Sequence, residues 1–284
     1  MEYFKVHFFK EKVRTINVEE LIAFFENLED FTIEMDEDSV RFNYKHPRLG
    51  YTAQFLIMPK SQISDIHRLN PRYLAINVHL ELPLLTPDYF ARHMFLIAKK
   101  LADKFNYFVY QSYFEDVLPF KLELLMKIFN LVKDKYLELN PKIAAEYHMI
   151  SKDNLSAILR YTDDNLELQK FYRDLETYVP YYYILLNNEN EINLAIEWTD
   201  DTLTVIPPHL DYIFYNKGSE VVILKYNEVS EQISKFLDDV PGFLRNTLVV
   251  PKKNKKKVLK VMRKYKFTKI NDRFTKIDLK TLLD

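Results

Sequence analysis

Acidic side chains and an imidazole gather in one short region, where a strand-like segment ends in the sequence EWTDDT. Glu197, Asp200 and Asp201 stand at this turn, and His209 and Asp211 follow in the sequence PPHLD. Carboxylates that converge on one point with an imidazole can bind a divalent cation. The region therefore predicts, as one alternative, a divalent-metal-dependent enzyme site. Its other interpretation is a solvated turn, because Asp suits turn backbones.

A basic segment, PKKNKKKVLKVMRKYKF, runs from Pro251 to Phe267 with nine basic residues and no acid. On a helix that begins near Asn254, the apolar residues share one face and the lysines point elsewhere. Three interpretations stay open: a solvated or intramolecularly paired face, an RNA- or DNA-binding surface over residues 251–266, and a surface for a membrane or an acidic protein. The candidate anion-binding residues are Lys252, Lys253, Lys255, Lys256, Lys257, Lys260 and Arg263.

Charge is distributed unevenly along the second half of the chain. Residues 143–250 hold eight basic and 18 acidic residues, whereas residues 251–284 hold 13 basic and three acidic residues. Dedicated nucleic-acid domains usually have a pI above about 9, and this chain has a pI of about 6.7. The balance favours pairing of the basic segment with an acidic surface of its own domain or of a second copy. Four lysines at the helix start favour a bound anion instead, because the helix dipole disfavours cations there.

Four polar residues of the first half are candidates for contacts with a partner protein. Strand parity places His7, Asn77, His79 and Tyr113 on the outward face of a predicted sheet. We expect this face to be open, to be lined by apolar and aromatic atoms, and to bind a peptide. A helix packed over the face would contradict this interpretation.

Composition excludes several other classes of site. The absence of cysteine removes disulfides, thiolate nucleophiles and cysteine-ligated metals. Three isolated glycines cannot form a phosphate-binding loop or a dinucleotide fingerprint, and neither HExxH nor GxSxG occurs. We expect a protein without a cofactor, more consistent with a non-enzymatic protein than with an enzyme.

No signal-like start and no apolar run of about 18 residues is present, so we expect a cytoplasmic protein without a membrane span. Scarce glycine with abundant Lys, Asn, Tyr, Phe and Ile is typical of an AT-rich bacterial genome.

Apolar periodicity predicts the elements that must position these residues. The first half reads as strand, helix, two strands around a turn, strand, helix, strand and helix. Asn17 is expected to cap the first helix, and Thr86 the second, with Pro87 at its first position. This order predicts an α+β domain over residues 1–142, with a ferredoxin-like antiparallel or mixed sheet and helices on one face.

The second half predicts a further, smaller domain. Residues 143–178 read as a helical connection capped at Ser151 and Thr162, and residues 179–284 as an α+β domain that ends in the basic helix and a hairpin around Asn271 and Asp272. The sequence thus predicts a two-domain α+β protein.

Residues 3–140 resemble the C-terminal domain of the ZipA family of bacterial cell-division proteins. The segments that carry this resemblance are the strand YLAINVHLELP, the helix ending IAKKLADKFN, the strand YFVYQSYF and the helix KLELLMKIFNLVKDK. Proteins of that family bind the tail of FtsZ, so the resemblance implies peptide recognition on the sheet and a link to cell division. We expect no counterpart of the family's N-terminal membrane anchor, so the resemblance does not imply tethering of the division ring. We therefore expect an interaction or adaptor protein, with nucleic-acid binding and metal-dependent catalysis as the alternatives.

Overall fold

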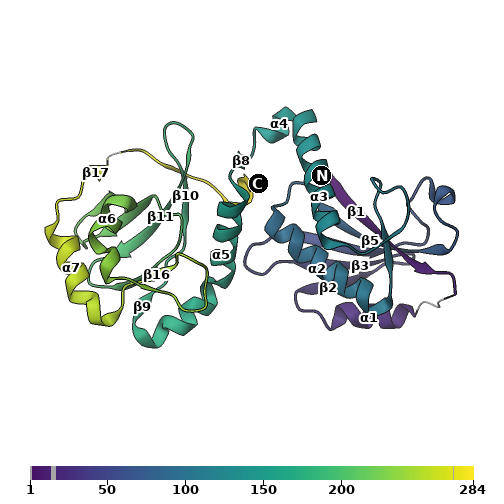
Figure 1. Ribbon diagram of the computed structural model, residues 1–284, viewed down its shortest axis with the longest axis horizontal. Coiled ribbons are helices and arrows are strands. Elements are labelled where there is room, and N and C mark those ends of the chain that lie inside the picture. The colour runs from purple at the N-terminus through teal and green to yellow at the C-terminus, as the bar shows by residue number, and fades with distance from the viewer. Residues whose placement is uncertain (1, 14–16, 271) are drawn as a thin grey trace. The chain divides into compact units, whose positions relative to one another are not determined.

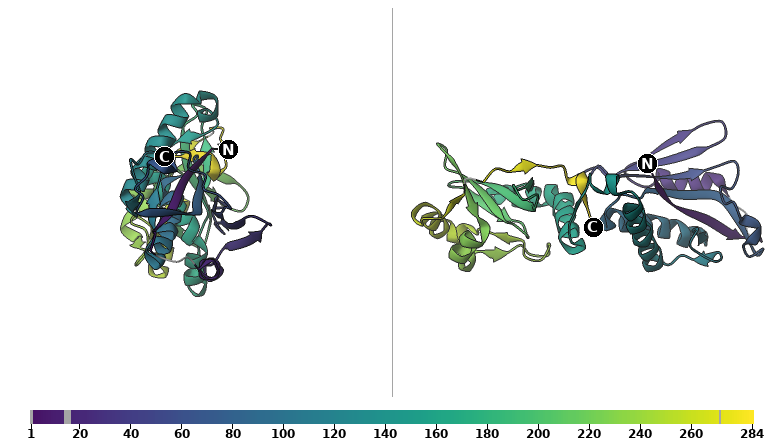
Figure 2. Two further views of the ribbon diagram at one scale, coloured as in Figure 1. Left: turned by 90° about the vertical axis from the view of Figure 1, so that its right-hand side faces the viewer. Right: turned by 90° about the horizontal axis from the view of Figure 1, so that it is seen from above.

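The computed structural model describes residues 2–13, 17–270 and 272–284. These residues combine helices with mixed and antiparallel sheets, which confirms the predicted α+β class. They form two compact units (Figures 1 and 2). Unit 1 comprises residues 1–147 and Leu283, and unit 2 comprises residues 148–282 and Asp284. Within the described ranges, no helix has both the length and the apolar character that a membrane crossing requires.

Unit 1 is built on a seven-stranded sheet in the order β2-β3-β4-β5-β1-β6-β7. Neighbouring strands run antiparallel. Because β1 lies between β5 and β6, the two strands that α2 connects, the strand adjacency is that of a split βαβ unit; the ferredoxin-like assignment itself stays a prediction. The elements are β1 (Tyr3–Glu11), α1 (Val18–Glu26), β2 (Phe31–Met35), β3 (Val40–Lys45), β4 (Thr52–Ile57), η1 (Ile66–Arg68), β5 (Tyr73–Pro83), α2 (Asp88–Phe105), β6 (Phe108–Tyr110), β7 (Leu118–Pro119), α3 (Leu122–Leu139) and α4 (Pro141–Ala144).

Aromatic contacts show that α1, α2 and α3 pack on the same face of this sheet. Phe25 of α1 stacks on Phe42 of β3 with ring centroids 4.1 Å apart. Phe95 of α2 and Phe129 of α3 make edge contacts with Phe4 of β1 at 5.8 and 5.4 Å. The register places Phe4 and Phe42 on one face. The opposite face, which these helices leave uncovered, is called the open face below.

Helix starts in unit 1 test the predicted caps. Asn17 caps α1 as predicted, since its Oδ1 accepts two N–H groups of the first turn at 3.0 and 3.3 Å. The predicted cap at Thr86 is wrong, because α2 begins at Asp88 and Pro87, in an extended conformation, precedes it as the cap. Thr86 is buried instead, and its carbonyl accepts a hydrogen bond from Lys133 at 3.5 Å.

Two strands of unit 1 differ from the sequence prediction. The edge strand β2 was not predicted, although Phe31 packs on Phe25 with ring centroids 5.3 Å apart. The strand predicted over residues 107–114 is only three residues long. It stops because the Gln111 side chain accepts the Tyr113 N–H at 2.7 Å, which closes a turn.

Unit 2 contains a six-stranded sheet in the order β17-β14-β13-β11-β10-β18 and a four-stranded sheet in the order β15-β16-β12-β9. Both sheets are mixed, since β11 pairs with β13 and β12 with β9 in parallel. A short pairing joins β8 (His148–Met149) to β19 (Leu282–Leu283). The other elements are α5 (Lys152–Tyr172), η2 (Arg173–Leu175), β9 (Thr177–Tyr178), β10 (Tyr183–Leu186), β11 (Ile192–Thr199), β12 (Leu203–Ile206), β13 (Tyr212–Asn216), β14 (Val221–Lys225), α6 (Tyr226–Ile233), η3 (Ser234–Phe236), β15 (Asp238–Asp239), β16 (Leu248–Val249), η4 (Lys252–Asn254), α7 (Lys255–Lys264), β17 (Lys269–Ile270), β18 (Thr275–Lys276) and η5 (Leu279–Thr281).

Helix α5 belongs to the core of unit 2 rather than to a connection between cores. Ser151 caps it as predicted, accepting the N–H of the third helical residue at 3.3 Å. The second predicted cap, Thr162, is wrong: it lies within the helix and its hydroxyl donates to a backbone carbonyl one turn earlier at 2.8 Å. Tyr161 and Asn165, both fully buried, donate to the carbonyl of Pro180 at 2.8 and 2.9 Å, which fixes the chain before β10.

The C-terminal segment contains the predicted basic helix but not the predicted hairpin. Helix α7 buries Val258, Leu259 and Met262, as the periodicity predicts. Asn271 lies outside the described residues, and the strands on either side of it do not pair with each other. Strand β17 joins β14 and β18 joins β10, at opposite edges of the sheet.

Left-handed backbone positions are made mainly by Asn and Asp. Asn106 ends α2 with φ 54°, and Asn77 interrupts β5 with φ 57°. Among the described residues, eight that are not glycine have positive φ, and four of them are Asn and two Asp. These side chains tolerate the left-handed region better than other residues with a Cβ.

Candidate functional site

The strand register determines which side chains form the open face of unit 1. Lys5 lies opposite Glu81, Glu81 opposite Gln54, and Gln54 opposite Asn43, in one row across four strands. Directly opposed residues of antiparallel strands point to the same face. The row is entirely polar, in contrast to the phenylalanines on the helix side of the same strands.

Glu81 is the centre of a hydrogen-bonded cluster in this row. Its Oε1 accepts from His79 Nε2 at 3.2 Å and lies 2.7 Å from Lys5 Nζ, and its Oε2 accepts from Gln54 at 2.7 Å. The hydrogen bond from His79, with those from Lys5 and Gln54, lowers the pKa of Glu81 to about 2. Lys5 also donates to Gln62 at 3.1 Å, so the loop after β4 reaches the open face.

The side chain of His7 lies beside this cluster and makes no hydrogen bond among the described residues. Its ring packs against His79 with ring centroids 5.2 Å apart. Burial, then the neighbouring His79 and Lys5, lower the pKa of His7 to about 3. The imidazole is therefore neutral at physiological pH, with one ring nitrogen as donor and the other as acceptor.

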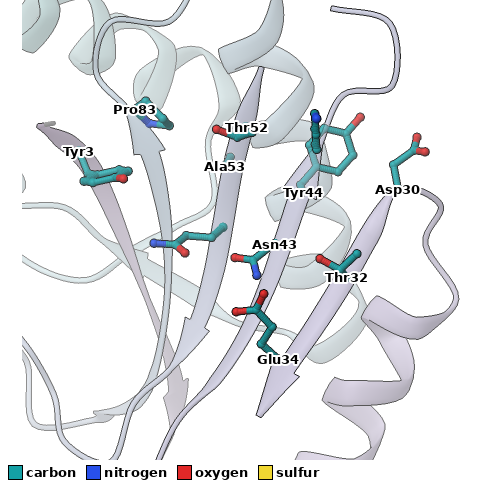
Figure 3. A pocket seen from close by; sticks show the side chains of 11 residues that line it. Tyr3, Asp30, Thr32, Glu34, Asn43, Tyr44, Thr52, Ala53 and Pro83 are labelled. Carbon is teal, nitrogen blue, oxygen red and sulfur yellow. The ribbon is translucent and has the colours of Figure 1, made fainter. Parts of the chain in front are cut away.

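Two hollows meet at Tyr3 on the open face. The first has a volume of about 410 Å³ and lies between Tyr3 and Pro83 on one side and Asp30, Thr32 and Glu34 on the other (Figure 3). The second has a volume of about 330 Å³ and is lined by residues of β1, the loop 62–64, the turn after β6 and α3. Tyr3 lines both, so the open face offers two adjoining depressions separated by one aromatic side chain.

The structure brings three of the four predicted partner contacts together. His7 and Tyr113 line the second hollow, and His79 lies under this region against His7, with only 2% of its surface exposed. Asn77 lies apart, because the register between β1 and β5 shifts beyond His7 and the Asn77 amide donates to the carbonyl of Pro59 at 3.4 Å. Strand parity cannot detect such an irregularity.

The lining of the first hollow combines aromatic and apolar surface, as expected, with many polar side chains. Apart from Tyr3, Tyr44, Ala53 and Pro83, its lining residues are polar: Asp30, Thr32, Glu34, Asn43, Lys45, Thr52 and Gln54. Sequence reasoning missed Asp30, Thr32 and Glu34 because β2 was not predicted. The alternation within β3 and β4 carries the signal that identifies Asn43 and Gln54.

In unit 2, the acidic turn predicted as a metal site faces the basic helix instead. Asp200 accepts a hydrogen bond from Tyr215 and pairs with Arg263 Nε at 3.0 Å. Asp201 lies 3.6 Å from Lys255 Nζ. Glu197, on β11, accepts a hydrogen bond from the Asn216 amide of the neighbouring strand β13. Asp200 and Asp201 are therefore engaged by cations of the chain.

The other two residues of that predicted set have separate surroundings. Asp211 accepts the backbone N–H of Leu194 at 2.8 Å, which fixes the start of β13 against β11, and burial raises its pKa. His209 is exposed in a left-handed turn with φ 58°. In the described part of the chain, no three His, Asp or Glu side chains are placed to hold a metal ion.

The predicted anion-binding residues begin in η4 and continue along α7. Lys252 and Lys253 lie in η4, and Lys253 Nζ is 2.9 Å from Asp238. Lys255 and Arg263 pair with the acidic turn described above. Pairing within unit 2 thus accounts for part of the basic segment, as its charge balance predicts. It leaves lysines further along α7 without an ion pair among the described residues.

Comparison with known proteins does not assign the chain to a family. No protein-family model matches the chain, and no curated protein or solved structure does so. The resemblance of residues 3–140 to the ZipA C-terminal domain therefore stays a prediction. Function has to be inferred from the surfaces of the two units.

Proposed function

We propose that the protein is a non-enzymatic adaptor that binds a segment of a partner protein across the open face of unit 1. The observation that carries this proposal is the pair of hollows that adjoin Tyr3: the first lies on the open face, and the second lies beside it, where Val132 of α3 also lines it. A partner segment that follows the face would occupy both hollows with Tyr3 at its centre. Tyrosine is among the residues that most often dominate binding energy at protein interfaces.

The polar groups of the first hollow favour binding of an extended segment that forms hydrogen bonds over binding of an apolar segment. Among the described residues, six of its side chains make neither a side-chain hydrogen bond nor an ion pair: Asp30, Thr32, Glu34, Asn43, Lys45 and Thr52. Donors and acceptors stand side by side, so they suit the backbone amides and polar side chains of a peptide. The Lys5–Glu81 pair beside them is already satisfied and contributes shape rather than net charge.

Cell division and a cytoplasmic location are the finer parts of this proposal. Both rest on sequence reasoning alone, the first on the resemblance of residues 3–140 and the second on composition. A partner that proves to be a cell-division protein would support both.

Site-specific photocrosslinking in the native cell tests the proposal. A benzophenone amino acid placed at the exposed Thr52 position in the first hollow is expected to give one discrete protein adduct. The matched control carries the same amino acid at Leu131, which is 56% exposed on α3. Tyr3→Ala is expected to abolish the adduct from position 52. Equal adducts from both positions, or an adduct that survives Tyr3→Ala in a folded variant, would reject the open face as the binding site.

A further inference from the structure

Ion pairs divide helix α7 of unit 2 into a paired side and an unpaired side. The acidic turn at Asp200 and Asp201 neutralises Lys255 and Arg263. A second row of basic residues, at spacings of three and four along the same helix, has no ion pair among the described residues: Lys257, Lys260 and Lys264. Such spacing places side chains on one helix face. Positive charge is thus concentrated on one side of α7.

This unpaired row borders an apolar groove of about 530 Å³. The groove lies between α7 and the preceding segment α6–η3, with Phe236 of η3 on one side and Val261 and Tyr265 on the other. Gln232 closes it at the α6 side, and all three lysines line it. Val258 and Met262 of α7 are buried in the core of unit 2 and hold the helix in place.

The chemistry of the groove specifies an occupant with two properties. An aliphatic or aromatic side chain that covered the apolar floor would contribute favourable binding free energy, because it would remove apolar surface from water. Carboxylates beside the lysines at the rim would add charge complementarity, which governs which partners an interface accepts. An acidic polypeptide segment that carries an apolar residue has both.

A single-stranded nucleic acid fits the groove less well, because bases need free aromatic faces for stacking. The ring of Phe236 has Lys235 Nζ and Lys257 Nζ at 5.2 and 5.8 Å from its centroid. The ring of Tyr265 packs against Phe267 with ring centroids 4.6 Å apart. Both aromatic side chains already have neighbours on their faces.

We propose that this groove binds an acidic segment of a partner protein, with an apolar side chain against Val261 and the edge of Phe236 and carboxylates beside the three lysines. The site lies wholly in unit 2. This proposal does not depend on peptide binding at the open face of unit 1.

Fluorescence anisotropy with the full chain and three labelled probes tests this. The first probe is a synthetic peptide that alternates Asp and Glu with Leu and Phe, the second has Ser in place of Leu and Phe, and the third is a length-matched thymidine oligonucleotide. The first probe is expected to bind at least about tenfold more tightly than the other two, since only it satisfies both the floor and the rim. The triple variant Lys257→Glu, Lys260→Glu and Lys264→Glu is expected to weaken it by at least about tenfold.

A control with the same net charge carries three reversals on exposed lysines of unit 1: Lys127→Glu, Lys135→Glu and Lys142→Glu. It is expected to bind the first probe as the unmodified chain does. Val261→Ser is expected to weaken the first probe and to leave the second unchanged. The proposal is overturned if the first probe does not bind, if the control variant loses binding as fully as the groove variant, or if the oligonucleotide binds most tightly.

Discussion

Protonation of His7 should make unit 1 sensitive to mild acid. The ordinary pKa of histidine is about 6.5, and burial together with His79 and Lys5 lowers that of His7 to about 3. Between these values the unfolded chain binds a proton at His7 and the folded chain does not. Stability is therefore complete above about pH 6.5 and falls as the pH decreases towards 3.

The size of the loss follows from the two pKa values. At about pH 5, His7 is almost fully protonated in the unfolded chain and almost fully neutral in the folded one. Relative to about pH 8, the free energy of unfolding should be lower by about 2 kcal/mol. The Glu81 carboxylate does not contribute in this range, because its pKa changes from 4.5 to about 2 and its effect begins at lower pH.

The assay has to report on unit 1 alone. The only tryptophan, Trp198, is buried in unit 2, so its fluorescence follows the wrong unit. Hydrogen exchange of β1 and β5 amides in increasing urea, read by mass spectrometry, gives the local free energy of unfolding. His7→Gln is expected to remove most of the difference between pH 8 and pH 5, whereas His67→Gln, at an exposed position of η1, is expected to retain it. An unchanged pH dependence in His7→Gln would refute the assignment of acid sensitivity to this residue.

Three further substitutions test the packing of unit 1. Phe25→Ala removes a fully buried ring stacked on Phe42, and should cost about 3–5 kcal/mol by urea denaturation; a loss below about 1 kcal/mol would contradict tight packing there. Lys133→Met removes the buried ammonium group 3.2 Å from the equally buried Asp88, so a loss of about 3–5 kcal/mol is expected in thermal and urea unfolding. Glu81→Gln should abolish the stability that the wild type loses as the pH falls from about 4.5 to about 2, measured by amide exchange in β5; an unaltered acid transition would speak against the cluster.

Local patterns predicted the elements whose cause is local. The apolar stripe of α1, its Asn17 cap and the alternation of β5 each depend on residues close in sequence, and the structure contains them. Thr86 and Thr162 were assigned as caps because their side chains suit that role. Tertiary packing placed one in a buried loop before α2 and the other inside α5.

The candidate sites depend on contacts that a single strand or helix does not encode. Arg263 and Asp200 are 63 residues apart, and their pairing separates the neutralised side of α7 from the unpaired side. The polar first hollow depends on the register of β2 with β3, which pairs Thr32 with Asn43. Charge counting indicated that pairing would occur, but not which lysines would remain without an acid.

The left-handed turns made by Asn and Asp, such as those at Asn77 and Asn106, have a consequence for the unfolded chain. Glycine is the most flexible residue when unfolded, and replacing it removes about 0.4–1 kcal/mol of backbone entropy that folding would otherwise have to overcome. A left-handed residue with a Cβ costs roughly 1–2 kcal/mol in the folded chain, and Asn and Asp reduce that cost by bonding locally. The two effects nearly cancel. A chain with only three glycines can thus form sharp turns with little loss of stability, while its unfolded form samples fewer conformations.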